Sequence, residues 1–147
     1  MALILAGICV IILLAVFWVK RAKDRRELEE HSITPEALHT LLAGNHDTLV
    51  LDVRQPLDLL ANSEIIPGAK RLAPRDVIEN PSLIPKEKDA VVYCTCPSDK
   101  TSITILHRAL AVNFLRVKFL KGGLAGWKAK GFPVEPYDKA FHLDSAV

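Results

Sequence analysis

Two cysteines stand close together in the stretch VVYCTCPSDKTS, residues 91–102. Cys94 ends an apolar run that predicts a strand, and in open α/β sheets ligands bind beyond the carboxyl ends of the strands. A helix that begins near Lys100 would direct free backbone N–H groups and the positive end of its dipole toward the sulfur. These effects and the charge of Lys100 favour the thiolate, so Cys94 is a candidate nucleophile above an anion site. The alternative is that Cys94 only packs, as many buried cysteines do.

Short apolar runs predict the strands that position this cysteine. They are TLVLDVR at 48–54, DAVVYC at 89–94 and RVKFL at 116–120. The first two are continuously apolar rather than alternating, which is typical of strands covered on both faces of a parallel sheet. Between them, IIPGAKRLAP and ENPSLIP are punctuated by prolines and are expected to form loops and short helical turns.

Helices are expected between and after these strands. Thr34-Pro35-Glu36 predicts an N-cap, a proline at the first helical position and an acid in the first turn, and Gly44-Asn45 ends that helix. A longer helix is expected over about 101–114, and a short one around Trp127. The expected buried positions are Leu38, Leu41 and Leu42 in the first helix and Ile103, Leu106 and Leu110 in the second. Strands that alternate with such helices predict a three-layer α/β domain with a mostly parallel central sheet.

The N-terminal segment has a different composition. Residues 2–19, ALILAGICVIILLAVFWV, carry no charge, and eighteen helical residues would span about 27 Å, enough for a bilayer core. A basic cluster follows at 20–26, beside Trp18, which suits the headgroup level. A signal peptide would need a positive charge before a shorter apolar core and a small-residue cleavage site after it. We therefore expect a single-pass anchor in the cell (inner) membrane, with the C-terminal domain facing the cytoplasm.

The rest of the chain is nearly neutral and contains two cysteines, Cys94 and Cys96. After residue 30 it holds fourteen Lys and Arg against thirteen Asp and Glu, so nucleic acid is not expected as a partner. Cys9 lies within the apolar segment, and Cys94 and Cys96 belong to a compartment that should keep thiols reduced. The expected organisation is an anchor at 1–19, a charged helical stalk at 20–31, a domain at 32–136 and a C-terminal tail at 137–147.

From about residue 32 to 136 the chain resembles a single-domain rhodanese. The resemblance rests on LVLDVR at 49–54, IPGAKRLA at 66–73, VVYC at 91–94 and LKGGLAGWKAKGFPVE at 120–135, in that order. It implies a rhodanese-like α/β fold and sulfurtransferase activity. By this resemblance, Cys94 takes a sulfane sulfur from a small donor such as thiosulfate, holds it as a persulfide and passes it to a thiol or another thiophilic acceptor. No cofactor or metal is implied.

The loop after Cys94 departs from the family pattern. Rhodanese loops of this type often carry arginine and glycine, which are absent here, and Lys100 closes a loop longer by at least one residue. Pro97 removes one backbone donor, and Asp99 places a negative charge near any bound anion, which should weaken thiosulfate binding. A thiol at Cys96 could attack a Cys94 persulfide or form a strained disulfide with it. The residues expected to bind substrate are Thr95, Cys96, Ser98, Asp99, Lys100 and Thr101.

Residues outside the loop are assigned supporting roles. By the resemblance, Asp52 and Arg54 orient loops through hydrogen bonds and ion pairing. Gly122 and Gly123 permit a backbone turn beside the loop, and Trp127 belongs to the core. Arg71 and Arg75 could add positive potential to the site. His31, His39, His46 and His142 show no ligand spacing and are expected at the surface, and His107 is expected to be a packed or surface residue.

Two other functions remain open at this stage. The fold could serve as a catalytically weak or inactive binding module that the stalk presents to a membrane protein partner. It could also act as a phosphatase or arsenate reductase, because related phosphatases close a longer cradle with arginine six positions after the cysteine. Lys100 occupies that place here, and lysine lacks the guanidinium fork that recognises phosphoryl oxygens bidentately.

Overall fold

The computed structural model describes residues 2–44, 47–95 and 98–138. Asn45, His46, Cys96, Pro97 and the segment 139–147, which includes His142, lie outside these ranges. The chain divides into two compact units, residues 1–31 and residues 32–147.

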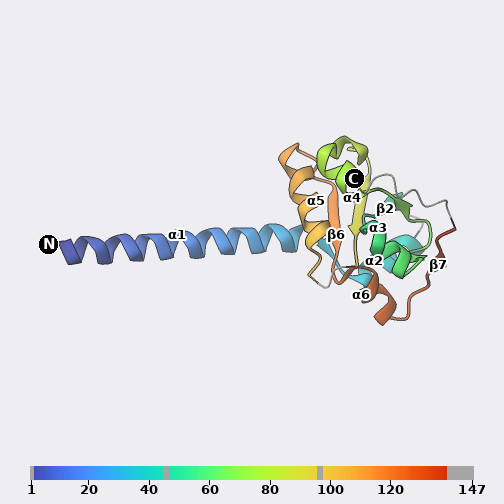
Figure 1. Cartoon of the computed structure of the whole chain (residues 1–147), viewed down its shortest axis with the longest axis horizontal. Helices are drawn as coiled ribbons and strands as arrows, with labels where there is room; N and C mark the ends of the chain where they lie inside the picture. Colours follow the sequence, from blue (N-terminus) through green and yellow to red (C-terminus); the bar gives the residue numbers. More distant parts are fainter. Residues whose placement is uncertain (1, 45–46, 96–97, 139–147) are drawn as a thin grey trace. The chain divides into compact units, whose positions relative to one another are not determined.

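The first unit is one long helix, α1 (Ala2–Glu30) (Figure 1). It continues through the charged segment that begins at residue 20, as expected. Large apolar side chains are exposed along it from Ile8 to Val19, including the consecutive run from Val10 to Leu14. Because successive helical residues point about 100° apart, such a run leaves apolar surface on every side of the helix. Within the described ranges, the structure contains no helix that is both long enough and apolar enough to cross a membrane.

The second unit is built on a five-stranded parallel sheet in the order β1-β6-β5-β2-β4. Its strands are β1 (Ser32–Ile33), β2 (Thr48–Asp52), β4 (Lys70–Arg71), β5 (Asp89–Tyr93) and β6 (Val117–Leu120). Asp52 stands opposite both Tyr93 and Arg71 in the register. The carboxyl ends of the three strands β4, β2 and β5 therefore lie level at one edge of the sheet.

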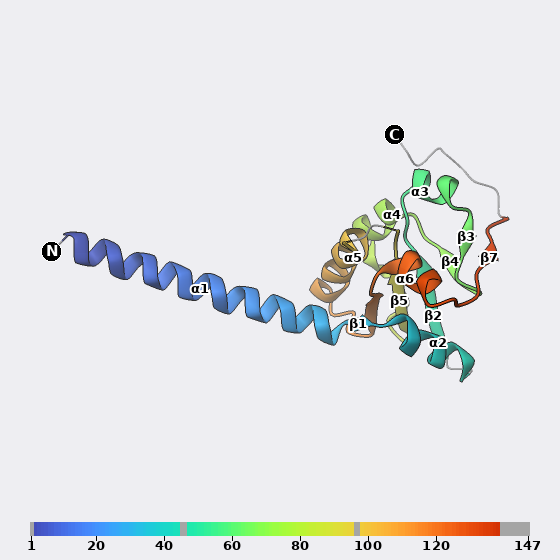
Figure 2. The same cartoon turned by 90° about the horizontal axis from the view of Figure 1, so that it is seen from below.

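Helices cover both faces of this sheet, which confirms the predicted α/β architecture with a mostly parallel sheet. In Figure 2, α4 (Pro74–Glu79) and α5 (Lys100–Ala111) lie on one side, and α2 (Pro35–Ala43) and α6 (Gly123–Ala129) on the other. The remaining helical elements are the short α3 (Pro56–Ala61) and the 3-10 turn η1 (Pro81–Leu83).

One side of the core joins α2 and α6 to the sheet. Leu38 of α2 and Trp127 of α6 pack with strand residues that include Val91 and Tyr93. Trp127 is 1% exposed, which confirms its predicted place in the core, and its indole N–H donates to the carbonyl of Pro133 at 2.8 Å. The predicted N-cap of α2 is also confirmed, because Thr34 Oγ1 accepts a hydrogen bond from the Ala37 N–H at 3.3 Å.

The helix after the cysteine loop differs from its prediction. It runs from Lys100 to Ala111 rather than over 101–114. Asn113 adopts a left-handed conformation, with φ of 61°, and such a residue ends a helix. The buried face also differs from the predicted one, because Ile103 and Leu110 are only partly buried. The buried residues of the helix are Ser102, Ile105, Leu106 and Ala109.

Four two-residue strands were not expected from the sequence. β1 and β4 add to the edges of the parallel sheet, and β3 (Glu64–Ile65) pairs antiparallel with β7 (Glu135–Pro136). Two residues are too few to show the alternation of a strand. The region between β2 and β5, which was predicted to form loops and short helical turns, therefore contains β3 and β4 as well as α4.

A buried ion pair joins the carboxyl ends of the strands. Arg54 and Asp52 are both 0% exposed, and Arg54 Nη2 lies 2.6 Å from Asp52 Oδ2. The guanidinium also donates to the carbonyls of Asn62 at 2.7 Å and Glu64 at 2.9 Å. The Tyr93 hydroxyl donates to Asp52 Oδ2 at 3.2 Å. Burial and the neighbouring Asp52 carboxylate raise the pKa of Tyr93, so its hydroxyl stays protonated and can donate.

Replacing Arg54 with methionine leaves the Asp52 carboxylate buried without its charge partner. We expect Arg54→Met to lower the free energy of unfolding by about 3–5 kcal/mol, the usual cost of removing one member of a buried pair. The matched control is Arg116→Met, which breaks an ion pair with Asp89 whose side chains are 54% and 62% exposed and should cost less than about 1 kcal/mol. Urea denaturation followed by near-ultraviolet circular dichroism measures both. Equal losses would contradict a structural role for the pair.

Candidate active site

Cys94 lies at the carboxyl edge of the sheet, directly after β5, and is 1% exposed. Side chains alternate between the two faces of a strand. Val91 and Tyr93 belong to the core cluster with α2 and α6, so Cys94, like Val92, points to the opposite face, where α5 packs. The helix that follows the loop therefore lies over the sulfur's side of the sheet.

The backbone of Cys94 is fixed from two directions. The Val53 N–H donates to the carbonyl of Tyr93 at 3.0 Å, and the Leu124 N–H donates to the carbonyl of Cys94 at 3.1 Å. The first bond ties β5 to the end of β2, and the second ties the start of the loop to α6. The backbone of the cysteine is thus held by the end of β2 and by α6.

The glycine pair makes this close approach possible. Gly122 and Gly123 have φ angles of 73° and 51°, and a Cβ added at Gly123 would lie 2.0 Å from the Cys94 carbonyl oxygen. Only glycine fits there, both because of the contact and because L residues rarely adopt such angles. The prediction that these glycines permit the turn beside the loop is confirmed.

Asp99 connects the far end of the loop to the same turn. It is 8% exposed and has a left-handed backbone, with φ of 52°. Its Oδ2 accepts a hydrogen bond from the Gly122 N–H at 2.8 Å, while its Oδ1 is buried and has no hydrogen-bond partner within the part of the chain that the structure describes. Burial raises the pKa of this carboxyl, and the Gly122 N–H partly opposes the rise. The carboxyl is thus an acceptor that holds the loop against α6 rather than a cap for α5.

Two hydroxyl groups of the loop and of the first turn of α5 are also buried with no hydrogen-bond partner among the described residues. They are Thr95 Oγ1 and Ser102 Oγ. Ser102 is 0% exposed and lies in the first turn of α5, on the face that packs against the sheet. Buried hydroxyl groups without a hydrogen bond are rare in proteins. Ser102 was missed by the sequence analysis, although a serine in the first turn of the helix after the nucleophile is a visible signal.

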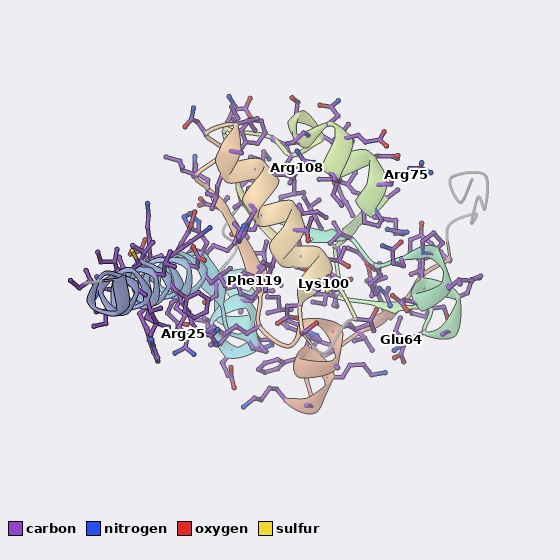
Figure 3. The ribbon with its side chains drawn as sticks, turned by 60° about the vertical axis from the view of Figure 1, so that its left-hand side comes forward. Arg25, Glu64, Arg75, Lys100, Arg108 and Phe119 are labelled. Atoms are coloured by element: carbon purple, nitrogen blue, oxygen red, sulfur yellow. The ribbon has the colours of Figure 1, made fainter. Side chains whose placement is uncertain are left out.

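The residues expected to bind substrate are brought together only in part. Thr95 and Asp99 lie buried or half-buried beside Cys94, whereas Ser98 and Lys100 are exposed and Thr101 is partly buried. Figure 3 shows Lys100 at the end of α5 that lies next to α6. Cys96 lies outside the described residues. Ser98 and Lys100 therefore offer their polar groups at the rim of the site rather than within it.

The two arginines considered as sources of positive potential have other partners. Arg71 Nη1 donates to the carbonyls of Asp52 at 3.3 Å and Leu72 at 2.7 Å, and burial lowers the pKa of its guanidinium. Arg75, on α4 (Figure 3), forms an exposed pair with Glu79 at 3.4 Å. Neither contact directs a guanidinium group to the cysteine loop.

The histidines do not gather around the cysteine. His107 is exposed on α5. His39 was expected at the surface but is partly buried, because its ring stacks on Phe132 with ring centroids 4.2 Å apart. Among the described residues, no group of three or more His, Cys, Asp or Glu side chains is placed to hold a metal ion.

A hollow of about 380 Å³ lies at the opposite edge of the sheet. Its lining includes Thr48 and Asp89, at the amino ends of β2 and β5, and apolar side chains of Ile33, Leu41 and Leu115. These residues include no cysteine. Cys94, Thr95 and Asp99 lie at the carboxyl edge of the sheet, and Ser102 lies in the first turn of the helix that follows them.

Comparison with known proteins identifies the family. The family model for the rhodanese-like domain matches residues 34–130. A protein named sulfurtransferase from Allochromatium vinosum is 31% identical over 104 residues, which cover 71% of this chain and 94% of the relative. Among solved structures, the Alr3790 protein of Anabaena sp. is 30% identical with a TM-score of 0.61, covering 71% of this chain and 82% of that one. A full-length protein from Lactobacillus plantarum has a TM-score of 0.68 at 24% identity, covering 80% and 97%, and shares the fold.

The match to the family model and the identity to the sulfurtransferase of Allochromatium vinosum agree with the parallel sheet and the cysteine at its carboxyl edge, and the chain belongs to the rhodanese-like domain family.

Proposed function

We propose that this protein is a sulfurtransferase in which Cys94 carries the transferred sulfur as a persulfide. Its family and its relative from Allochromatium vinosum support a sulfurtransferase-type function in general. The observation that carries the specific proposal is the place of Cys94, at the carboxyl end of β5 and ahead of the N-terminus of α5, with its carbonyl held by the Leu124 N–H. A helix N-terminus favours the thiolate and its negative products.

Sulfur transfer at this cysteine takes two displacement steps. The Cys94 thiolate attacks the outer sulfur of the donor; a new S–S bond forms at Cys94 as the donor's bond to that sulfur breaks, and its electron pair leaves with the donor remnant. An acceptor thiolate then attacks the outer sulfur of the Cys94 persulfide. That step forms the acceptor persulfide and returns Cys94 as a thiolate, so no external oxidant or reductant is consumed.

Cys96 is proposed as a second stage of the transfer. A thiolate two residues from the persulfide could take over the sulfur before it reaches the acceptor. Such a relay would make release of the sulfur depend on Cys96, while its uptake would depend on Cys94 alone.

Intact-mass spectrometry of the full-length protein tests the persulfide. After incubation with a sulfane-sulfur donor and removal of excess donor, we expect a gain of about 32 Da, one sulfur atom, which a reductant removes, as thiolate chemistry requires. The gain should be lost in Cys94→Ser and retained in the control Cys9→Ser, which removes the exposed thiol of α1. Cys96→Ser should retain the gain but slow its transfer to an acceptor thiol.

A different pattern would favour another function. If a folded protein with an alkylatable Cys94 gains no sulfur from thiosulfate or from a hydropersulfide, the domain is better described as a binding module. Hydrolysis of a phosphotyrosine analogue that disappears in Cys94→Ser would point to the phosphatase alternative instead.

The proposed place of the enzyme is the inner membrane, with the catalytic domain in the cytoplasm. The support is the uncharged sequence 2–19, the exposed apolar side chains of α1 between Ile8 and Val19, and the basic cluster that begins at Lys20. Apolar surface on all sides of a helix is unfavourable in water. The positive-inside bias places the residues after the cluster in the cytoplasm.

Membrane attachment predicts a clear fractionation result. The full-length protein should stay with the membrane pellet in alkaline carbonate, and Leu13→Arg should move a substantial fraction to the supernatant, because a central arginine costs about 2.5–3.5 kcal/mol on insertion. The matched control is Leu57→Arg, at a leucine of α3 that is 74% exposed. Release of the unaltered protein by carbonate would contradict the anchor, and a fused C-terminal reporter active only outside the cytoplasm would contradict the orientation.

A further inference from the structure

The cysteine loop contains a buried acid at a place where an anionic substrate would need positive charge. Asp99 is 8% exposed. A Cβ placed on Gly123 would lie 2.0 Å from the Cys94 carbonyl oxygen and 3.6 Å from Asp99 Oδ1. The carboxyl oxygen without a partner and the Cys94 peptide unit thus lie against the same glycine carbon. The carboxylate therefore lies close to the backbone of the residue that carries the sulfur.

No cation among the described residues compensates Asp99. Among the described residues, its carboxylate accepts a hydrogen bond from the Gly122 N–H, at 2.8 Å. Lys100 is the next residue but is exposed, and the buried guanidinium of Arg54 is bound by Asp52. Because the pKa of Asp99 is raised by burial and not lowered by a neighbouring cation, the charge of its ionised form is poorly balanced within the site.

The remaining polar groups of the site suit a small ligand of low charge. Thr95 Oγ1 and Ser102 Oγ are buried hydroxyl groups that have no partner in residues 2–44, 47–95 and 98–138, and each can donate one hydrogen bond and accept others. Asp99, the residue before α5, makes no side-chain cap to the helix, so the N–H groups of the first turn are available to a ligand. The helix dipole places the equivalent of about half a positive elementary charge there, which partly balances a single negative charge on sulfur. The N–H groups and the dipole cannot also balance a doubly charged donor beside Asp99.

We propose that Asp99 determines the donor specificity of this enzyme, selecting hydropersulfides of small thiols, R–S–SH, and disfavouring the thiosulfate dianion. This inference rests on the proposed sulfurtransferase function of Cys94. Asp99 acts through the charge that it places beside the donor, while Thr95 and Ser102 supply hydrogen bonds to the incoming sulfur.

The balance of charge in the two reactions explains the selection. With a hydropersulfide, the Cys94 thiolate attacks the terminal sulfur, the RS–S bond breaks, and RS⁻ leaves while Cys94 becomes Cys–S–SH; the reacting groups carry one negative charge throughout. With thiosulfate, the thiolate attacks the outer sulfur and sulfite leaves, so the reacting groups carry three negative charges. Repulsion from Asp99 is correspondingly larger for thiosulfate.

The test compares the rates at which full-length protein gains the sulfur mass on Cys94 from sodium thiosulfate and from cysteine hydropersulfide. Asp99→Asn is the informative variant, because asparagine tolerates the left-handed conformation and can still accept the Gly122 N–H. We expect it to raise the ratio of the thiosulfate rate to the hydropersulfide rate by about tenfold. The matched control, Asp89→Asn, removes an exposed acid at the opposite end of β5 and should leave the ratio unchanged.

A salt series on the unaltered protein gives an independent measurement. Salt screens repulsion between like charges, so added sodium chloride should speed loading from thiosulfate more than loading from the hydropersulfide, and this difference should shrink in Asp99→Asn. If Asp99→Asn fails to fold, Asp99→Gly replaces it in both measurements, because glycine adopts the left-handed backbone of this position and removes the carboxylate.

The possible outcomes separate this inference from the function on which it rests. Loading of Cys94 from both donors with an unchanged rate ratio in Asp99→Asn, or with no difference in salt response, would overturn the specificity role and leave the sulfurtransferase function standing. Failure of both donors to load Cys94 in the unaltered protein would overturn the function itself, and the specificity role with it.

Discussion

The buried pair of Asp52 and Arg54 is the interaction on which the site depends. A charged pair without access to water is stable only when its remaining hydrogen-bonding groups are satisfied. Here the requirement is met by the Tyr93 hydroxyl, the backbone N–H of Arg54 and the carbonyls of Asn62 and Glu64. The hydrogen bonds of the pair therefore connect the end of β2 with the end of β5 and with the start of β3. Cys94 leaves the sheet from this arrangement, one residue after Tyr93.

A second constraint comes from backbone contact rather than charge. Gly123 approaches the Cys94 carbonyl so closely that no side chain fits between them, and Asp99 holds the Gly122 N–H from the other end of the loop. The loop is thus attached to the turn before α6 at both of its ends. The ion pair and the glycine turn therefore hold the Cys94 backbone from two sides.

The sequence predicts the parts of this fold whose signals are local. The apolar runs of β2 and β5, the Thr34 cap and the buried Trp127 follow from residue type and short spacing. The two-residue strands have no such signal, because tertiary pairing alone defines them. The end of α5 was missed because Asn113 reverses the backbone, which is only one of the conformations open to asparagine. The partners of Arg71 depend on strand order, which spacing along the chain does not give.

The charged side chains at the carboxyl edge differ in what they contact. Of the cationic side chains described near this edge, Arg54 pairs with Asp52, Arg71 donates to backbone carbonyls, and Lys100 is exposed. The acid Asp99 is buried close to the backbone of Cys94. Because a buried charge acts more strongly than an exposed one, the electrostatic potential at Cys94 depends more on Asp99 and the N-terminus of α5 than on the net charge of the domain.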